Sequence, residues 1–310
     1  MPSLRSRKSV RQLAVLSHYF EKNEKGENCE MGYSIFDETM VDMTWPEIEK
    51  MAEQGAIVLL PTGIIEEHGP HMGLAVDTYI AYLMSKLAKH GLEARGIKTL
   101  IAPPCYWGVS QGTSTFAGTF SIRKETMKAV IYDILASLNR WGLNRVFIIN
   151  WHADYHHCIA VLEAVREARL DTGIGACCIV ADFDVRRLRL TGEEDYILVQ
   201  KMPPPRSMSP KYVDLHAGSL ETGMMLNYFP DQVDAELAKR LKATELTYDD
   251  LRVLGKGDSE VREAIPLGYF GDPASFDIET ARQFIEGNAR DLAGLIERFI
   301  KGSYQIPAAG

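Results

Sequence analysis

The chain has 310 residues, of which 46% are hydrophobic, and it carries a formal net charge of −8. A chain of this size can bury the core of one large domain, and its composition does not favour two equal domains. The acidic balance and the lack of a basic stripe argue against nucleic-acid binding, because that function needs cationic side chains that neutralise phosphates.

The beginning of the chain combines basic residues with a short apolar patch, and no later stretch approaches the length of a membrane span. The five cysteines form no C-x-x-C pair, which is typical of free thiols in a reducing compartment. We therefore expect a cytoplasmic protein, with no membrane or nucleic-acid partner, whose cysteines are buried as small hydrophobic residues.

Residues 1–38 are mixed in charge and have no steady period, which predicts an N-terminal arm before a main domain at residues 39–303. A helix is expected to begin after Thr44, with Glu47 completing a capping box, and to end at Gly55. The apolar run 56–60 is then typical of a buried strand. A polar loop leads from this strand to a helix over residues 78–91.

Strands and helices continue to alternate along the chain. Strands are expected before Pro103 and over residues 144–150 and 175–183, and helices over residues 123–142 and from about Cys158. His156 and His157 are expected at the start of that last helix. This alternation predicts a three-layer α/β/α sandwich with a mostly parallel sheet.

The order of the pattern weakens from residue 185 to residue 213, where three consecutive prolines interrupt a charged stretch. A long irregular segment of this kind indicates a lid or an oligomer contact. A loop then enters a helix at Ser219, and an amphipathic helix over residues 280–300 closes the domain.

Three separate segments bring carboxylates and imidazoles. They are Glu66, His68 and Asp77 after the first strand, His152 and Asp154 after the third, and His216 and Glu221 further on. Two of these segments follow strands that should be neighbours in the sheet, so their loops should meet at the same edge.

Oxygen and nitrogen ligands without a thiolate suit Zn²⁺ or Mn²⁺. The carboxylates would repel one another if bare, whereas two divalent cations that share a carboxylate would neutralise them. Two metals about 3.5–4 Å apart can hold a bridging water, lower its pKa toward about 7 and polarise a carbonyl group.

These segments resemble the motifs of the creatininase (creatinine amidohydrolase) family. The stretch PTGIIEEHGPH with its downstream Asp77 is similar to the first family motif, NWHAD to the second and HAGSLET to the third. The resemblance covers residues 44–300. It implies the family's fold, hydrolysis of a C–N bond in a small amide or cyclic amide, two metal ions, and a homo-oligomer that is a hexamer in the family.

The resemblance also implies a role for each residue. The metal ligands would be Glu66, His68, Asp77, His152 and Asp154. Asp77 would bridge the two ions. His216 and Glu221 would form an acid/base pair that holds water and protonates the departing nitrogen.

The sequence departs from the family pattern at several positions. Many members have Gln where this chain has Glu67, and Gly-Gly-Asn where it has residues 153–155. Asp154 is one methylene shorter than the glutamate of the creatininases. Trp151 replaces a small residue and should narrow the pocket. His71 fits a ligand or a hydrogen-bond partner of one equally well.

Other readings remain open. The same metal core would suit the opening of a keto-inositol ring, peptide trimming, or deformylation of a pyrimidine nucleotide whose phosphate Arg206 or Lys211 could bind. The literal G-x-S-x-G at residues 108–112 would make Ser110 the nucleophile of a serine hydrolase, but the prolines before it and the loop after it do not fit a nucleophile elbow. A non-catalytic metal-binding scaffold is the remaining alternative.

Overall fold

A five-stranded parallel sheet forms the centre of the fold in the computed structural model, which describes residues 34–202, 213–253 and 258–304. The strand order is β2-β1-β3-β4-β5, and every neighbouring pair runs parallel. The strands are β1 (Ile57–Thr62), β2 (Thr99–Ile101), β3 (Arg145–Asn150), β4 (Gly175–Ala181) and β5 (Ile197–Gln200).

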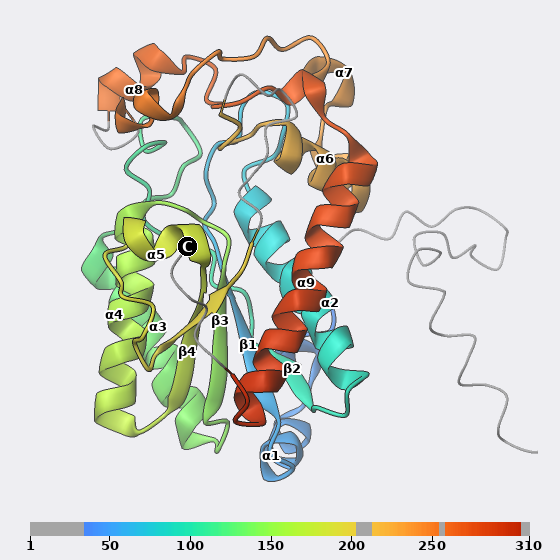
Figure 1. Ribbon diagram of the computed structural model, residues 1–310, viewed down its shortest axis with the longest axis vertical. Helices are drawn as coiled ribbons and strands as arrows, with labels where there is room; N and C mark the ends of the chain where they lie inside the picture. The colour runs from blue at the N-terminus through green and yellow to red at the C-terminus, as the bar shows by residue number, and fades with distance from the viewer. Residues whose placement is uncertain (1–33, 203–212, 254–257, 305–310) are drawn as a thin grey trace, which may run out of the picture. The chain divides into compact units, whose positions relative to one another are not determined.

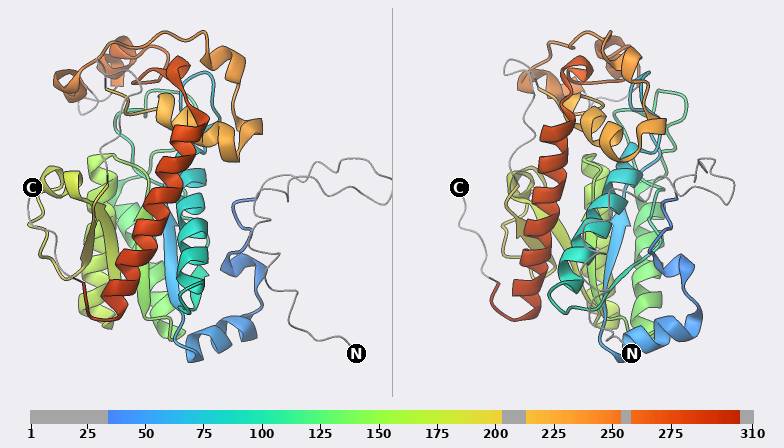
Figure 2. Two further views of the ribbon diagram at one scale, coloured as in Figure 1. Left: turned by 45° about the vertical axis from the view of Figure 1, so that its right-hand side comes forward. Right: turned by 90° about the vertical axis from the view of Figure 1, so that its right-hand side faces the viewer.

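Helices cover both faces of this sheet, as Figures 1 and 2 show. On one face α2 (Val76–Glu93) packs beside α9 (Ile278–Ile300), and on the other α3 (Lys124–Arg140) packs beside α4 (Tyr155–Thr172). All six residues of β1 are buried, as expected for a parallel strand covered on both faces. The predicted three-layer sandwich is confirmed.

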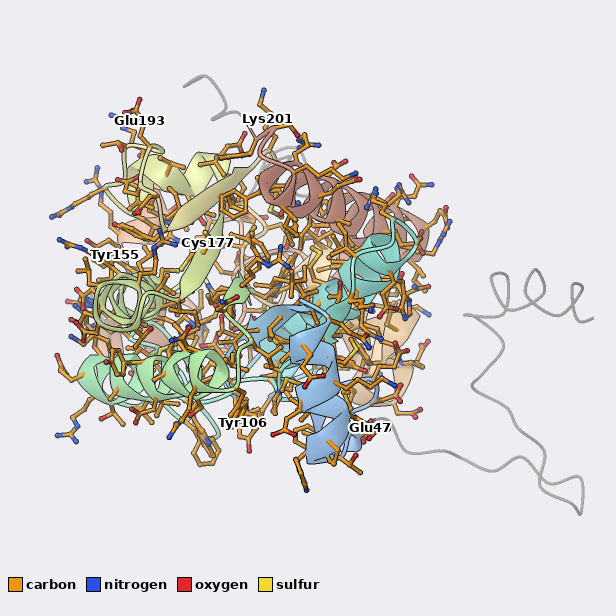
Figure 3. The ribbon with its side chains drawn as sticks, turned by 90° about the horizontal axis from the view of Figure 1, so that it is seen from below. Glu47, Tyr106, Tyr155, Cys177, Glu193 and Lys201 are labelled. Carbon is orange, nitrogen blue, oxygen red and sulfur yellow. The ribbon has the colours of Figure 1, made fainter. Side chains whose placement is uncertain are left out.

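Apolar side chains lie between the layers of the fold, and most charged side chains lie at its surface. In Figure 3, Cys177 of β4 lies in the packed interior, whereas Glu47 and Glu193 lie at the outer edge. The four cysteines in the described ranges, Cys105, Cys158, Cys177 and Cys178, are all buried free thiols. None of the described helices combines the length and the apolarity that crossing a bilayer would need.

The sequence signals place some helix ends correctly, whereas α2 continues past residue 91, its expected end, to Glu93. The helix α1 (Trp45–Glu53) begins with the predicted capping box, in which the Thr44 backbone N–H donates to the Glu47 carboxylate at 2.7 Å. The helix α4 begins at Tyr155, so that His156 and His157 lie in its first turn, and it ends at Gly173 in the left-handed conformation.

The expectation of an irregular segment from residue 185 to residue 213 is wrong in part. This stretch contains the end of α5 (Asp182–Arg187) and the whole of β5. The strand was missed because its four residues are flanked by charges and are too short to show a period. Residues 203–212, with Arg206 and Lys211, lie outside the described ranges, and the lid or oligomer role of this segment stays a prediction.

Most of the predicted N-terminal arm also lies outside the described residues. Of the part that is described, Asp37 and Glu38 form ion pairs with Lys86 of α2 at 2.7 and 3.1 Å. The boundary between residues 38 and 39 stays a prediction.

Short helices and α6 (Ser219–Tyr228) complete the described chain. They are η1 (Met40–Asp42), η2 (Pro230–Gln232), α7 (Ala235–Ala238), η3 (Tyr248–Val253), α8 (Asp258–Ala264) and η4 (Pro273–Ser275). The backbone of His216 pairs with that of Phe270, and this antiparallel bridge fixes the segment that leads into α6.

The strand order reverses between β1 and β3, because the chain leaves β1 toward β2 and then returns to the other side of β1. In open α/β sheets the carboxyl ends of the two strands at such a reversal border the ligand site. Thr62 and Asn150, the last residues of β1 and β3, are paired in register. The two loops that follow therefore start at the same level.

Gly63 allows this edge to close against α2. A Cβ at this position would lie 2.8 Å from the Asp77 carbonyl carbon and 2.9 Å from the Thr78 nitrogen, both of which are backbone atoms. Backbone in a buried helix turn has no room to move aside. The contact sets how near the first turn of α2, with Asp77, lies to the end of β1.

We predict that Gly63→Ala lowers the free energy of unfolding by about 1–3 kcal/mol, the usual cost of overpacking. The control is Gly287→Ala within α9, where the new methyl would meet only the Arg290 guanidinium at 3.8 Å. That control should gain about 0.5–1 kcal/mol from helix propensity. Urea unfolding of both variants checks the prediction, and equal midpoints would contradict it.

Candidate metal centre

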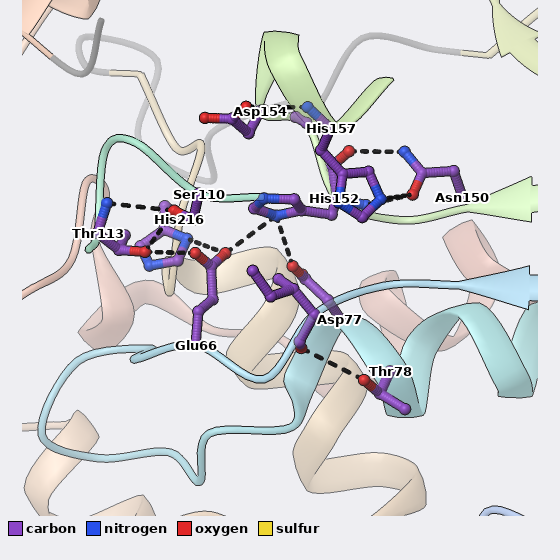
Figure 4. A network of polar contacts seen from close by, with 12 residues as sticks. Glu66, Asp77, Thr78, Ser110, Thr113, Asn150, His152, Asp154, His157 and His216 are labelled. Atoms are coloured by element: carbon purple, nitrogen blue, oxygen red, sulfur yellow. Dashed lines mark hydrogen bonds and ion pairs between the residues drawn. The ribbon is translucent and has the colours of Figure 1, made fainter. Parts of the chain in front are cut away.

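Four separate pieces of chain supply the polar side chains at the carboxyl edge of the sheet. The loop after β1 carries Glu66 and His68, and the first turn of α2 carries Asp77. The loop after β3 carries His152, and the segment entering α6 carries His216 and Glu221. Figure 4 shows the carboxylates of Glu66 and Asp77 directed at His152.

A first group joins two carboxylates to one imidazole. The Nδ1 atom of His152 lies 3.1 Å from Glu66 Oε1 and 2.8 Å from Asp77 Oδ2. All three side chains are buried. Their ligand atoms are close enough together to hold one cation.

A second group shares Asp77 with the first. The other carboxylate oxygen of Asp77, Oδ1, lies 3.4 Å from His68 Nε2. The Oε2 atom of Glu221 lies 3.9 Å from the same nitrogen. In a third grouping His216 joins Glu66 and His68, with His216 Nδ1 4.0 Å from Glu66 Oε1. Asp77 is therefore placed between two imidazoles that come from different loops.

Backbone carbonyl groups fix the orientation of the three imidazoles. His152 Nε2 lies 2.9 Å from the Val109 carbonyl oxygen, His68 Nδ1 lies 3.2 Å from that of Glu66, and His216 Nε2 lies 2.9 Å from that of Glu67. A carbonyl oxygen only accepts, so each of these nitrogens carries the proton. Each neutral ring then turns its unprotonated nitrogen toward the carboxylates, the arrangement typical of metal-binding histidines.

The carboxylates at this site stabilise positive charge. Burial opposes a charge on His152, but the carboxylates of Glu66 and Asp77 raise its pKa well above the usual value. Burial also opposes a charge on His216, yet its bond to Glu67 and the nearby carboxylates raise its pKa to about 10. Positive charge, whether as protons or as metal ions, is stabilised at the points where the ring nitrogens face the carboxylates.

Two buried atoms support a cation further. His68 Nε2 and Asp77 Oδ2 make no hydrogen bond, although Asp77 Oδ2 lies close to His152. A buried polar atom without a partner is costly, and a coordinated cation would remove that cost. The donor set consists of carboxylate oxygens and imidazole nitrogens without a thiolate, so these residues fit two divalent ions such as Zn²⁺ or Mn²⁺.

The loop over residues 108–113 holds the potential ligands in place through hydrogen bonds. The Thr113 hydroxyl donates a short hydrogen bond to Glu66, and the Ser110 hydroxyl lies 2.7 Å from that of Thr113. Ser110 is buried, and the next helix begins only at Lys124, so the G-x-S-x-G stretch lacks the context of a nucleophile elbow. The contacts give Ser110 and Thr113 a supporting position that the sequence did not reveal.

A second chain of hydrogen bonds holds the loop of His152. The Val109 N–H donates to His157 Nδ1 at 3.3 Å, and His157 Nε2 donates to Asn150 Oδ1 at 3.0 Å. The Asn150 amide nitrogen in turn donates to the His152 carbonyl oxygen at 2.6 Å. Burial lowers the pKa of His157 well below its usual value, which keeps the ring neutral as this network requires.

Asp154 is the one predicted ligand that the structure does not bring to the cluster. Its carboxylate is the N-cap of α4 and accepts from the backbone N–H groups of His156 and His157 at 2.8 and 3.1 Å. It also accepts from the Gln111 N–H at 2.9 Å. Glu221, predicted to be part of an acid/base pair, lies instead among the potential ligands.

His71 and Glu67 lie beside the cluster. His71 Nε2 is 2.9 Å from the Thr222 hydroxyl, and burial, followed by the charge of His68, lowers the pKa of His71 to about 4. His71 joins none of the ligand groups. Glu67, which the sequence analysis noted only as a departure, lies 3.3 Å from His216 Nε2 through Oε1. The feature of the sequence that could have indicated a role for Glu67 is that a second acidic residue directly precedes His68.

A cavity of about 870 Å³ opens at this edge of the sheet. Its lining includes Glu66, Asp77, His152, His216 and Glu221. The aromatic residues Trp151, Tyr155, Phe183 and Phe284 line the same cavity. The cluster is thus accessible to a small molecule.

We predict that Asp154→Ala lowers the free energy of unfolding by about 0.5–2 kcal/mol through loss of the helix cap, while Asp154→Ser retains most of the stability. Both variants should bind as much metal as the native chain when metal is supplied in excess. Chemical denaturation and elemental analysis measure the two effects. A loss of bound metal in Asp154→Ser would identify Asp154 as a ligand.

Comparison with known proteins agrees with this geometry. The family model described as Creatininase, creatinine amidohydrolase, matches residues 41–296. Creatinine amidohydrolase from Pseudomonas putida is 27% identical over 66% of this chain and 76% of its own length. A mycofactocin precursor peptide peptidase from Mycobacterium tuberculosis is 31% identical over 78% of this chain and 85% of its own length.

A crystal structure of creatininase has the same fold, with a TM-score of 0.60 and 22% identity over 84% of this chain and 97% of the other. The family match covers nearly the whole of the described domain and includes all three polar segments. The chain therefore belongs to the creatininase family of hydrolases.

Proposed function

We propose that this hydrolase uses two divalent cations, Zn²⁺ or Mn²⁺, to cleave the C–N bond of an amide or cyclic amide with water. The observation that carries the proposal is the orientation of the imidazoles. Backbone carbonyl groups hold the protons of His68 and His152 away from the cluster, and the free nitrogens of both rings face the carboxylate of Asp77.

The geometry supports a particular set of ligands. Glu66, Asp77 and His152 would hold one ion, and His68, Asp77 and Glu221 the other, with Asp77 shared. Creatininase structures of this fold are named as a manganese form and as a Zn-Zn form, which supports the choice of metals. When bound, the two cations would supply Lewis acidity that polarises a carbonyl group and makes water more acidic.

The residues around the ions handle the protons. The reaction forms a bond between a water oxygen and the carbonyl carbon, breaks the C–N bond, and needs a proton on the departing nitrogen. We propose that His216 Nδ1 takes a proton from the attacking water and delivers it to this nitrogen. His216 Nδ1 faces the cluster, while the contacts of Nε2 with Glu67 hold the ring in place. Glu221 would orient the site as a ligand and would not share the acid/base role.

The names of the relatives limit the class of reaction but do not identify the substrate of this chain. One is named for creatinine and another for a precursor peptide, and both names describe cleavage of a C–N bond. No contact among the described residues favours the keto-inositol or nucleotide reactions. The buried Ser110 hydroxyl, bonded to Thr113, does not favour a serine nucleophile either.

We also propose a homo-oligomer, in line with the hexamer that the family resemblance implies. Trp45 and Leu170 are 71% and 75% exposed. Large apolar side chains at a surface are often covered by a neighbouring subunit. Light scattering on the purified protein would report the number of subunits.

We predict that amide hydrolysis disappears on chelation and returns with Mn²⁺ or Zn²⁺. Asp77→Ala should abolish activity and leave fewer than two bound ions. Ser110→Ala should cost no more than about 10–100-fold, the usual effect of losing hydrogen-bond support to a ligand, whereas loss of a serine nucleophile would cost about 10⁶-fold.

Kinetics and elemental analysis of the same preparations make these comparisons. Activity that is indifferent to the chelator, together with a 10⁶-fold loss in Ser110→Ala, would overturn the metal mechanism. Metal binding at two sites without hydrolysis of any amide would favour the scaffold reading.

A further inference from the structure

The cavity beside the metal centre is larger than a small cyclic amide requires. Its volume of about 870 Å³ lies near the upper end of the roughly 300–1,000 Å³ that is typical of sites for drug-sized ligands. The potential metal ligands occupy only part of its wall. A substrate that filled this space would extend well beyond the reacting amide group.

Aromatic side chains from separate parts of the chain line the rest of the cavity. Trp151 directly precedes His152, and its backbone N–H donates to the Thr62 carbonyl oxygen at 3.1 Å, which fixes it where β1 and β3 end. Its ring meets that of Phe284 in α9 edge to face, with the centroids 6.5 Å apart and the planes at 81°. This fixed pair offers a rigid apolar wall next to a metal ligand.

Phe183 contributes a further ring from α5. It is 45% exposed, although it belongs to the described residues that line the cavity. An aromatic side chain that remains this exposed inside a cavity can still gain contact when a ligand covers it. Leu220 and Leu292 add apolar surface to the same lining.

The charges of the lining disfavour an anionic ligand. Arg187 is the one arginine or lysine among the described lining residues, and its Nε lies 2.6 Å from Asp184. Its Nη1 donates to the Ala153 carbonyl oxygen at 2.8 Å. The guanidinium is therefore already engaged, while Asp154, Asp184 and Asp214 add negative charge to the lining.

We propose that Trp151, Phe183 and Phe284 form a subsite for a flat aromatic or bulky apolar substituent of the amide substrate, and that this substituent carries no negative charge. The proposal deepens the function proposed above and rests on it. Burial of one aromatic group of the size of a phenylalanine side chain should raise kcat/KM by about 10- to 100-fold relative to the unsubstituted amide.

Three amides with the same reacting group test this subsite: acetamide, phenylacetamide and 4-carboxyphenylacetamide. We expect kcat/KM for phenylacetamide to exceed that for each of the other two by at least tenfold. Phe183→Ala and Trp151→Ala should bring the ratio of phenylacetamide to acetamide close to one. The matched controls Phe120→Ala and Trp141→Ala alter rings that are 53% and 50% exposed and are not among the lining residues, so they should keep the ratio.

Binding to the chelated protein gives a second readout that needs no turnover. By calorimetry or saturation-transfer NMR, phenylacetamide should bind the metal-free native chain and both controls, and should bind Phe183→Ala at least tenfold more weakly. Because Phe183 lies on α5 and not on the loop that carries His152, this variant separates lost contact from a displaced metal ligand.

The two readouts distinguish the subsite from the reaction. If no amide is hydrolysed but phenylacetamide binds and Phe183→Ala weakens it, the subsite stands and the proposed amide chemistry fails. If acetamide and phenylacetamide are hydrolysed equally well and bind equally weakly, the subsite is overturned and the amide chemistry stands. If 4-carboxyphenylacetamide is the preferred substrate, the proposal that the substituent carries no negative charge is overturned.

Discussion

The site depends on one buried carboxylate placed between two imidazoles. Asp77 Oδ2 lies 2.8 Å from His152 Nδ1, and Asp77 Oδ1 lies 3.4 Å from His68 Nε2. Because both nitrogens lack a proton when the rings are neutral, their lone pairs and the carboxylate oxygens would repel one another. The repulsion ends when positive charge enters on each side of Asp77. Two divalent cations, as proposed above, would supply that charge.

The fold provides what this arrangement needs. The reversal of strand order between β1 and β3 brings the loops of His68 and His152 to one edge, and the paired ends of these strands put them at one level. Gly63 lets the first turn of α2 approach until Asp77 lies between the loops. The side chains are therefore positioned by backbone that is itself fixed by the sheet.

Support around the ligands comes largely from the loop over residues 108–113. Its Val109 carbonyl sets the tautomer of His152, and Thr113 holds Glu66. The Asp154 carboxylate ties the same loop to α4 through the Gln111 N–H. A stretch that resembles a serine-hydrolase motif thus orders potential metal ligands, which explains why its serine is buried and hydrogen-bonded.

Much of the fold and part of the site could be predicted from the sequence. The alternation of apolar runs and helical periods gave the layered sheet, and the adjacency of β1 and β3 brought Glu66 and His152 together. The position of the Asp154 carboxylate could not be predicted, because a residue directly before a helix can turn its carboxylate toward the backbone N–H groups of that helix. Local spacing does not reveal which way it turns.

Long-range contacts explain the other differences. Glu221 reaches the cluster because α6 packs against α9 and α2, and no pattern in the sequence fixes its distance from His68. His71 lies close to His68 along the chain, yet its Nε2 atom is bound to Thr222, 151 residues away. The strand β5 is too short to show a period and is defined by its pairing with β4.

Anomalous X-ray scattering from crystals of the purified, metal-replete protein, recorded at the zinc and manganese absorption edges, is the most direct measurement. We expect two peaks, one between Glu66, Asp77 and His152 and the other between His68, Asp77 and Glu221. A map without a peak beside Asp77, from protein that hydrolyses an amide, would contradict the two-ion centre.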